Sequence, residues 1–158
     1  MTIAVGDAIP SATLHEGSPG NKHDPAELFA SGKHVLFGVP GAFTPGCSKT
    51  HLPGYVSNFD AWKAKGIDSI NCMAVNDAFV MAAWGEAHEA SDKVRMLADP
   101  AGDFATSMGL DVNAAVLGGK RSKRFALVVE GGKVTHLQVE PDGFGLTCSL
   151  AESLLEQL

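Results

Sequence analysis

The segment Thr44-Pro45-Gly46-Cys47 combines the start of a helix with a cysteine. Threonine is a favourable N-cap residue, proline fits the first helical position, and Cys47 then falls at the third. A thiol at that position faces unpaired backbone N–H groups and the positive end of the helix dipole, and both favour the thiolate over the thiol. Because the thiolate is the nucleophile, Cys47 is a candidate catalytic residue. The alternative is a small buried hydrophobic side chain.

Arg124 is a second candidate, because it directly precedes an apolar run over residues 125–129. Period-two alternation places Arg124, Ala126 and Val128 on one face of the predicted strand. A guanidinium at the edge of a buried strand can stabilise a thiolate and a developing oxyanion. Taken alone, the commoner interpretation of such a residue is a solvated loop arginine.

The other two of the three cysteines differ in context. Cys148 directly precedes Ser149-Leu150-Ala151-Glu152, a capping-box pattern that predicts a last helix, so we expect Cys148 to be exposed near a helix start. From the residues alone, an unpaired surface thiol and a redox-active cysteine are equally good interpretations. Cys72 alternates with Ile70 and Ala74 in an apolar run, which indicates a buried and unreactive thiol.

His51 lies one helical turn after Cys47. The two residues could form a Cys/His catalytic pair or half of a metal site, but a metal needs two more ligands and no spacing supplies them. We therefore expect His51 on the helix surface, and we expect no metal. The sequence also lacks a Cys-x-x-Cys pair, which argues against a thioredoxin-type thiol-disulfide carrier.

The composition is typical of a soluble globular protein, with 158 residues of which 45% are hydrophobic and 19% are charged. This length suits a single domain over residues 1–158. The net charge of -6 disfavours nucleic acid as the main partner, and the basic run Lys120–Arg124 is interpreted mostly as solvated loop. No apolar run approaches the roughly 18 residues of a membrane span, and the N-terminus shows no signal-peptide pattern. We therefore expect an intracellular protein.

The element that carries Cys47 follows a buried strand predicted over residues 35–39, which ends at Pro40-Gly41. Cys47 would thus lie at the carboxyl end of a central strand, where open α/β sheets place their sites. A helix is predicted over 45–65, with a kink or break at Pro53 and Gly66 as its stop. Further elements are expected as a helix from Asp24-Pro25, strands over 69–75 and 94–98, a helix capped by Asn76-Asp77 over 78–89, and a hairpin of residues 125–129 and 134–139 around Gly131-Gly132. This order predicts a mixed sheet with helices on both faces.

The run from Pro40 to Cys47, Pro-Gly-Ala-Phe-Thr-Pro-Gly-Cys, resembles the peroxidatic motif of peroxiredoxins, Pro-x-x-x-Thr-x-x-Cys. Its continuation through Pro53 is similar to the peroxiredoxin 5 subgroup in particular. The likeness covers essentially the whole chain, including residues 5–10, 75–79, 97–100 and 145–150. It implies an α/β protein with a thioredoxin-like fold, a central mixed β-sheet flanked by helices, and peroxiredoxin-type additions.

The resemblance also implies a role for each matching residue. Cys47 matches the peroxidatic nucleophile, Thr44 the active-site hydroxyl, Pro40 the proline that shields the sulfur, and Arg124 the active-site arginine. The backbone amides of Gly46 and Cys47 would help to bind the peroxide.

Cys148 matches the resolving cysteine of the atypical two-cysteine class, which closes a disulfide within one chain. Both cysteines lie at predicted helix starts. We therefore expect them to be too far apart to bond in the reduced protein. Oxidation would then require movement of the segment 143–148, unwinding of the turn at 44–47, or both.

The implied function is thiol-dependent reduction of hydrogen peroxide and organic hydroperoxides, with peroxynitrite as a further candidate. The reaction would pass through a sulfenic acid and an intramolecular disulfide, would be recycled by thioredoxin, and would need no cofactor. The alternative is a redox sensor or adaptor whose disulfide state controls binding to a protein partner. The expected assembly is a monomer or a non-covalent homodimer. The expected location is the cytoplasm, with mitochondria as an alternative and peroxisomes as a weaker one, because the tail Glu156-Gln157-Leu158 matches the peroxisomal signal poorly.

Overall fold

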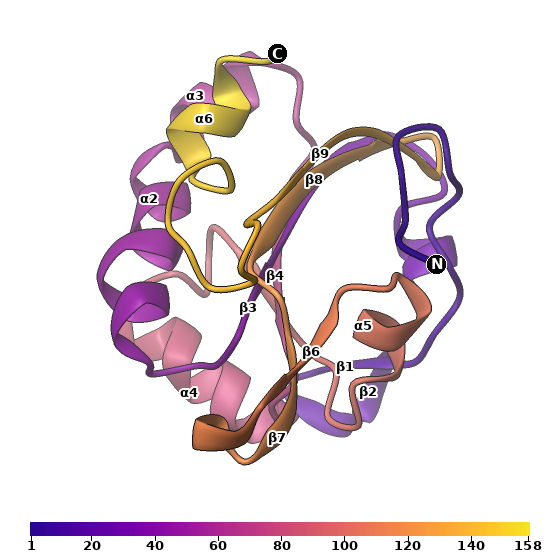
Figure 1. Cartoon of the computed structure of the whole chain (residues 1–158). Coiled ribbons are helices and arrows are strands. Elements are labelled where there is room, and N and C mark those ends of the chain that lie inside the picture. Colours follow the sequence, from indigo (N-terminus) through magenta and orange to yellow (C-terminus); the bar gives the residue numbers. More distant parts are fainter.

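A seven-stranded mixed β-sheet forms the centre of the protein, in the order β2-β1-β5-β4-β3-β8-β9 (Figure 1). The computed structural model describes residues 1–158. β3, β4 and β5 are parallel, whereas β8 pairs antiparallel with β3 and β9 antiparallel with β8. The strands of this sheet are β1 (Leu14–Glu16), β2 (Ser18–His23), β3 (Lys33–Val39), β4 (Ser69–Ala74), β5 (Arg95–Ala98), β8 (Phe125–Glu130) and β9 (Lys133–Val139). The predicted central strands and the late hairpin are confirmed, whereas β1 and β2 were not foreseen.

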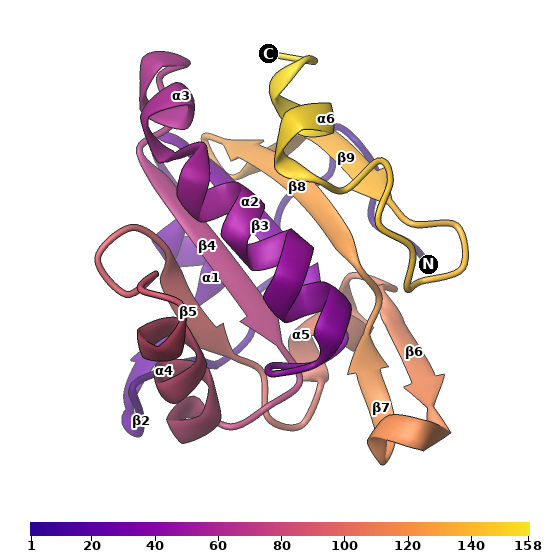
Figure 2. The same ribbon diagram turned by 90° about the vertical axis from the view of Figure 1, so that its left-hand side faces the viewer.

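Helices cover both faces of the sheet, as predicted (Figures 1 and 2). On one face lie α2 (Leu52–Ser57), α3 (Phe59–Ala64), α4 (Ala78–Ala87) and α6 (Ala151–Leu155), and on the other lie α1 (Pro25–Leu28) and α5 (Asp103–Ser107). The side-chain caps expected for α1 and α4 are present, because Asp24 accepts from the amide of Ala26 and Asp77 from the amide of Val80. Both helices therefore begin where the sequence indicated.

Alternation along β3 separates the two hydrophobic cores. Val35, Phe37 and Val39 pack with α2, α3, α4 and α6, whereas Leu36 packs on the opposite side. Gly38 stands opposite Phe125 in the β3–β8 register, and a Cβ at position 38 would overlap the aromatic ring. Only glycine therefore lets β8, and with it Arg124, lie this close to β3.

The helix expected over residues 45–65 is divided into three parts. A π-helical turn, η1 (Cys47–His51), comes first, and the amide of Leu52 donates to the carbonyl of Cys47 five residues earlier. This wider turn precedes Pro53, whose ring would crowd the carbonyl of Lys49 in a regular α-helix. The expected irregularity at Pro53 is therefore confirmed, but the break between α2 and α3 falls at Asn58 and was missed.

The basic run Lys120–Arg124 is not mostly solvated loop, and that prediction was wrong. Residues 119–122 form β7 (Gly119–Ser122), which pairs antiparallel with β6 (Asp111–Ala114) across the short 3₁₀ helix η2 (Ala115–Leu117). Ser122 and Arg124 are both buried. The run has the charged composition of a loop, but two of its alternate residues, Ser122 and Arg124, are turned toward the protein interior.

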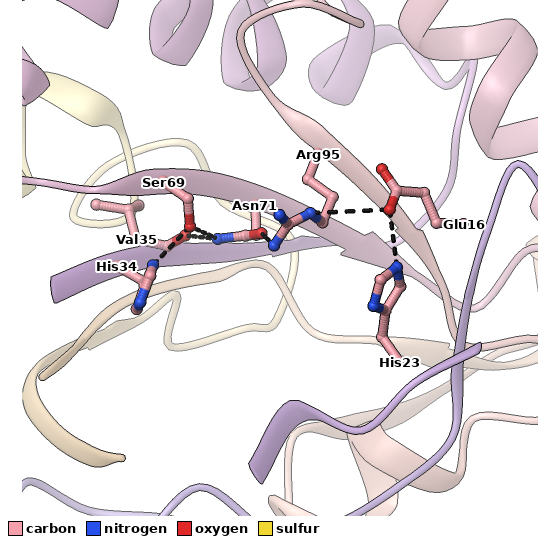
Figure 3. A network of polar contacts seen from close by, with 7 residues as sticks. All are labelled: Glu16, His23, His34, Val35, Ser69, Asn71 and Arg95. Carbon is pink, nitrogen blue, oxygen red and sulfur yellow. Dashed lines mark hydrogen bonds and ion pairs between the residues drawn. The ribbon is translucent and has the colours of Figure 1, made fainter. Parts of the chain in front are cut away.

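A network of polar contacts joins the amino-terminal ends of β3, β4 and β5 to β1 and β2 (Figure 3). Asn71, which is fully buried, donates to the Val35 carbonyl and to Ser69 and accepts from Arg95, which also pairs with Glu16. Cys47 follows the opposite, carboxyl-terminal end of β3. The network therefore braces the sheet away from the cysteine turn.

No helix of the protein has the length and apolar character needed to span a membrane.

Candidate active site

The turn that carries Cys47 begins directly after β3. Pro40 is buried, and the amide of Ser48 donates to the Thr44 carbonyl at 2.9 Å, so the first helical hydrogen bond starts at Thr44. Cys47 is thus the third residue of the helical turn, as predicted, and its side chain is completely buried against the helical layer. The thiol is held at a helix start and shielded from bulk water.

Thr44 occupies the N-cap position, but its side chain does not cap the helix, so the predicted capping interaction is wrong. Its hydroxyl donates to the Gly41 carbonyl at 2.7 Å, so its oxygen retains only acceptor capacity toward the site. Between these residues, Phe43 has φ 64°, a left-handed conformation that is strained for a bulky side chain. Strain of this kind concentrates at functional turns.

Three contacts fix this turn to the rest of the protein. Asn76 accepts from the amide of Ala42 at 3.0 Å, and Trp84 of α4 donates to the hydroxyl of Ser48 at 3.0 Å. Arg121 of β7 donates to the carbonyl of Pro40 at 3.4 Å. Elements on either side of the turn therefore hold its backbone in place.

Arg124 lies beside the same turn. Ala126 and Val128, which were predicted to share a strand face with Arg124, pack in the hydrophobic core that also contains Cys47. The residue is 4% exposed, Nε donates to the Phe144 carbonyl at 3.2 Å, and Nη1 donates to Nδ1 of His51 at 3.1 Å. Nη2 has no hydrogen bond within the chain, and a Cβ added to Gly46 would lie 3.2 Å from it. One guanidinium nitrogen is thus left free at the residue before Cys47.

His51 is not on the helix surface, and that prediction was wrong. The π-turn points its ring inward, where it is fully buried and donates through Nε2 to the Ser149 carbonyl at 3.1 Å. Because a carbonyl only accepts, Nε2 carries the proton and Nδ1 accepts from Arg124. Burial, followed by the neighbouring guanidinium, lowers the pKa of His51 from 6.5 to about 3. The ring is therefore neutral and positions Arg124.

Cys148 is half-buried, so the expected exposure is only partly met. Its Sγ lies 3.5 Å from the Val139 carbonyl and 3.7 Å from Oε2 of Glu140. Burial, and then the negative charge of Glu140, raise the pKa of the Cys148 thiol. The three cysteines are all free thiols, and Cys148 is held as a thiol near the end of β9.

Cys72 lies in β4 and is fully buried, which confirms the predicted packing position. Burial, together with a smaller contribution from Cys47, raises the pKa of the Cys72 thiol well above its ordinary value. A neutral, inaccessible thiol of this kind is chemically inert.

Glu140 was not predicted as a site residue, and the helix-capping role predicted for Ser149 is wrong. The expected capping box is wrong, because Leu150 is the N-cap of α6 without a side-chain bond, and the Ser149 hydroxyl donates to Glu140 at 2.6 Å. A signal for Glu140 existed, since a carboxylate directly after an apolar strand must find donors if it is buried. The location of those donors is set by tertiary structure.

The assembled site places a buried thiol, free backbone N–H groups of a helix start, one guanidinium nitrogen and one hydroxyl acceptor around the same turn. Such donors can stabilise negative charge that develops on a small polar substrate attacked by sulfur. No group of three or more His, Cys, Asp or Glu side chains is arranged to hold a metal ion.

Comparison with known proteins gives consistent results. The redoxin family model matches residues 4–155. Peroxiredoxin-2D of Arabidopsis thaliana is 42% identical over 160 residues, covering 99% of this chain and 98% of that protein. Reduced Prx3 of Vibrio vulnificus in complex with hydrogen peroxide is 46% identical, with 99% of both chains covered and a TM-score of 0.93. Peroxiredoxin 5 of Alvinella pompejana is 39% identical, with 99% of both chains covered and a TM-score of 0.85.

Proposed function

We propose a reaction sequence for this chain, which belongs to the redoxin family and is a peroxiredoxin, a thiol-dependent peroxidase with a thioredoxin-like fold. In this sequence Cys47 is the peroxidatic nucleophile and Cys148 is the resolving cysteine. The substrates are hydrogen peroxide and small organic hydroperoxides, and thioredoxin is the reductant. The complex of the similar Vibrio vulnificus protein with hydrogen peroxide supports the choice of substrate.

In the first step the Cys47 thiolate attacks one peroxide oxygen. A sulfur–oxygen bond forms, the oxygen–oxygen bond breaks, and the second oxygen leaves as hydroxide or alkoxide and takes up a proton. Cys47 becomes a sulfenic acid. Negative charge moves from sulfur to the leaving oxygen, so fixed donors around both atoms lower the barrier.

The arrangement around Arg124 carries the proposal. Its Nε and Nη1 are engaged by Phe144 and His51, so Nη2 is held in position at Gly46 and is free to bind an oxygen. Thr44, whose hydroxyl proton is given to Gly41, can accept the peroxide O–H. The amides of Gly46 and Cys47 supply further donors at the helix start. Pro40 helps to close the site around the sulfur.

In the second step the Cys148 thiol attacks the sulfenic sulfur. A disulfide forms, the sulfur–oxygen bond breaks, and the hydroxyl leaves as water with the thiol proton. A dithiol reductant of the thioredoxin type then reduces the disulfide by thiol exchange. No metal, haem or flavin takes part in this sequence.

The test is peroxide consumption by the wild type, Cys47→Ser and Cys148→Ser with a thioredoxin system. We expect no activity in Cys47→Ser, because the nucleophile is lost. Cys148→Ser should consume one equivalent of peroxide and then fail to turn over with thioredoxin. A Cys47→Ser protein that keeps a tenth of the wild-type rate would contradict the assignment. Stoichiometric oxidation of the wild type without turnover would instead favour a redox sensor.

A further inference from the structure

The carboxylate of Glu140 binds the residues on both sides of Cys148, Thr147 and Ser149. The residue directly follows β9 and is only 1% exposed, yet its carboxylate accepts hydrogen bonds from the backbone amides and hydroxyls of both Thr147 and Ser149. The Ser149 contacts measure 2.8 Å from the amide and 2.6 Å from the hydroxyl. A buried carboxylate with this many donors is held firmly in its ionised form.

The charge of Glu140 is well supported by these contacts. Burial opposes ionisation, but the hydrogen bonds from Ser149 and Thr147 outweigh it and lower the pKa of Glu140 from 4.5 to about 2. Asp142, the other carboxylate of this loop, is exposed and accepts instead from the amides of Phe144 and Gly145 at 2.9 and 2.8 Å. The two carboxylates thus organise different parts of the loop.

The same carboxylate lies beside the thiol of Cys148, which is directed at Glu140 and at the Val139 carbonyl. Both of these groups are hydrogen-bond acceptors, so they favour the thiol and disfavour the thiolate. Cys47 lies in the hydrophobic core beneath the helices, and no hydrogen bond joins the two sulfurs. We infer that Cys148 leaves these acceptors when it bonds to Cys47, and that its neighbours Thr147 and Ser149 then release the carboxylate.

We propose that Glu140 is a positioning residue that holds the Cys148 segment closed in the reduced enzyme and thereby sets the rate of disulfide formation. This inference rests on the proposed function of Cys148. Release of the segment precedes the second step, in which the disulfide forms and water leaves with the thiol proton. While the segment is held, Cys47 sulfenic acid is exposed to a second peroxide, which would oxidise it to sulfinic acid and leave as water or alcohol. Glu140 therefore sets the balance between resolution and overoxidation.

Glu140→Gln keeps the side-chain shape but removes the charge, and its amide nitrogen cannot accept from Ser149 or Thr147. We expect disulfide formation after one equivalent of peroxide to become faster by about tenfold, the order expected from loss of one charge-assisted hydrogen bond. The fraction of sulfinic acid at high peroxide should fall accordingly. Quenching at successive times, followed by mass spectrometry of the sulfenic, disulfide and sulfinic forms, measures both steps in one sample.

Asp142→Asn is the matched control, because it removes a carboxylate from the same loop without touching the Cys148 contacts. We expect its resolution rate to stay close to that of the wild type. Equal acceleration in Asp142→Asn and Glu140→Gln would overturn the proposal, because it would indicate general loosening of the loop. Slower or unchanged disulfide formation in Glu140→Gln would overturn it as well.

A second set of variants keeps the test informative if Glu140→Gln folds poorly. Ser149→Ala and Thr147→Val each remove one hydroxyl donor to Glu140 and should accelerate disulfide formation by a smaller factor. Neither should add to the effect of Glu140→Gln, because their acceptor is then already altered. Full additivity would contradict the proposal. If the wild type forms no Cys47–Cys148 disulfide at all, the proposed role of Cys148 is wrong. If the wild type and Glu140→Gln form this disulfide at equal rates, only the proposed role of Glu140 is wrong.

Discussion

Replacing Arg124 with methionine tests whether the guanidinium acts on the reaction or only on the fold. Methionine has a similar length and can fill the buried site, but it cannot donate to the Phe144 carbonyl or to His51 Nδ1. Each acceptor left unsatisfied costs about 1–3 kcal/mol, so we expect the free energy of unfolding to fall by a few kcal/mol. The backbone of Arg124 still binds the Gly143 carbonyl at 2.7 Å and the Glu140 amide at 3.0 Å.

The effect of Arg124→Met on the reaction should exceed its effect on folding. Loss of one donor to a developing oxyanion typically costs about 10²–10³-fold in rate, and we expect that loss in the second-order rate of Cys47 oxidation. Stopped-flow tryptophan fluorescence of reduced protein mixed with peroxide measures this step without a reductant. Arg95→Met is the control, because Arg95 binds Asn71 and Glu16 at the opposite, amino-terminal end of the central strands. A rate for folded Arg124→Met within fivefold of wild type would refute the proposed role.

Three further predictions concern single residues. Thr44→Val should slow Cys47 oxidation by about 10²-fold, and because the Gly41 carbonyl also loses its donor, unfolding must be measured alongside; near-normal kinetics would remove Thr44 from the site. Cys72→Ala should retain turnover and the Cys47–Cys148 disulfide, and peptide mapping that finds Cys72 in the main oxidised species would contradict this. The folded-state pKa of His51 is about 3 against 6.5 ordinarily, so its neutral form contributes stability above pH 6.5 that is lost as the pH falls toward 3. Urea unfolding should therefore show a loss of up to about 2 kcal/mol between pH 6.5 and 5 in the wild type, and a flatter profile in His51→Gln; equal slopes would show that His51 does not titrate in this way.

Local patterns were sufficient to predict the elements that carry the site. The apolar run of β3, the caps at Asp24 and Asp77 and the Gly131-Gly132 hairpin are each determined by residues adjacent in sequence. The position of Cys47 at the third residue of a helical turn follows for the same reason. These features need no knowledge of which elements meet in space.

The failures involve side chains whose partners are distant in the sequence. His51 follows a helical spacing that suggests the surface, but the π-turn before Pro53 directs it to Ser149, 98 residues away. Ser149 satisfies the pattern of a capping box, yet a buried carboxylate at position 140 offers a stronger, charged acceptor for its hydroxyl. At both residues a tertiary contact takes the place of the predicted local one, and no local sequence pattern indicates which of the two contacts forms.

The contacts of Ser149 connect the Cys148 segment to Arg124 through one polar network. Its hydroxyl and amide bind Glu140 beside Cys148, while its carbonyl accepts from His51 and from Tyr55 at 2.8 Å. His51 in turn accepts from the guanidinium of Arg124, so displacing Ser149 would remove the partner that orients the ring. If the Cys148 segment leaves Glu140 to form the disulfide, as proposed, the support of Arg124 is disturbed after the peroxide bond has been broken, when that donor is no longer needed. In that scheme the return of Ser149 to Glu140 restores the contact of the Ser149 carbonyl with His51, so that Arg124 is again held for the next peroxide.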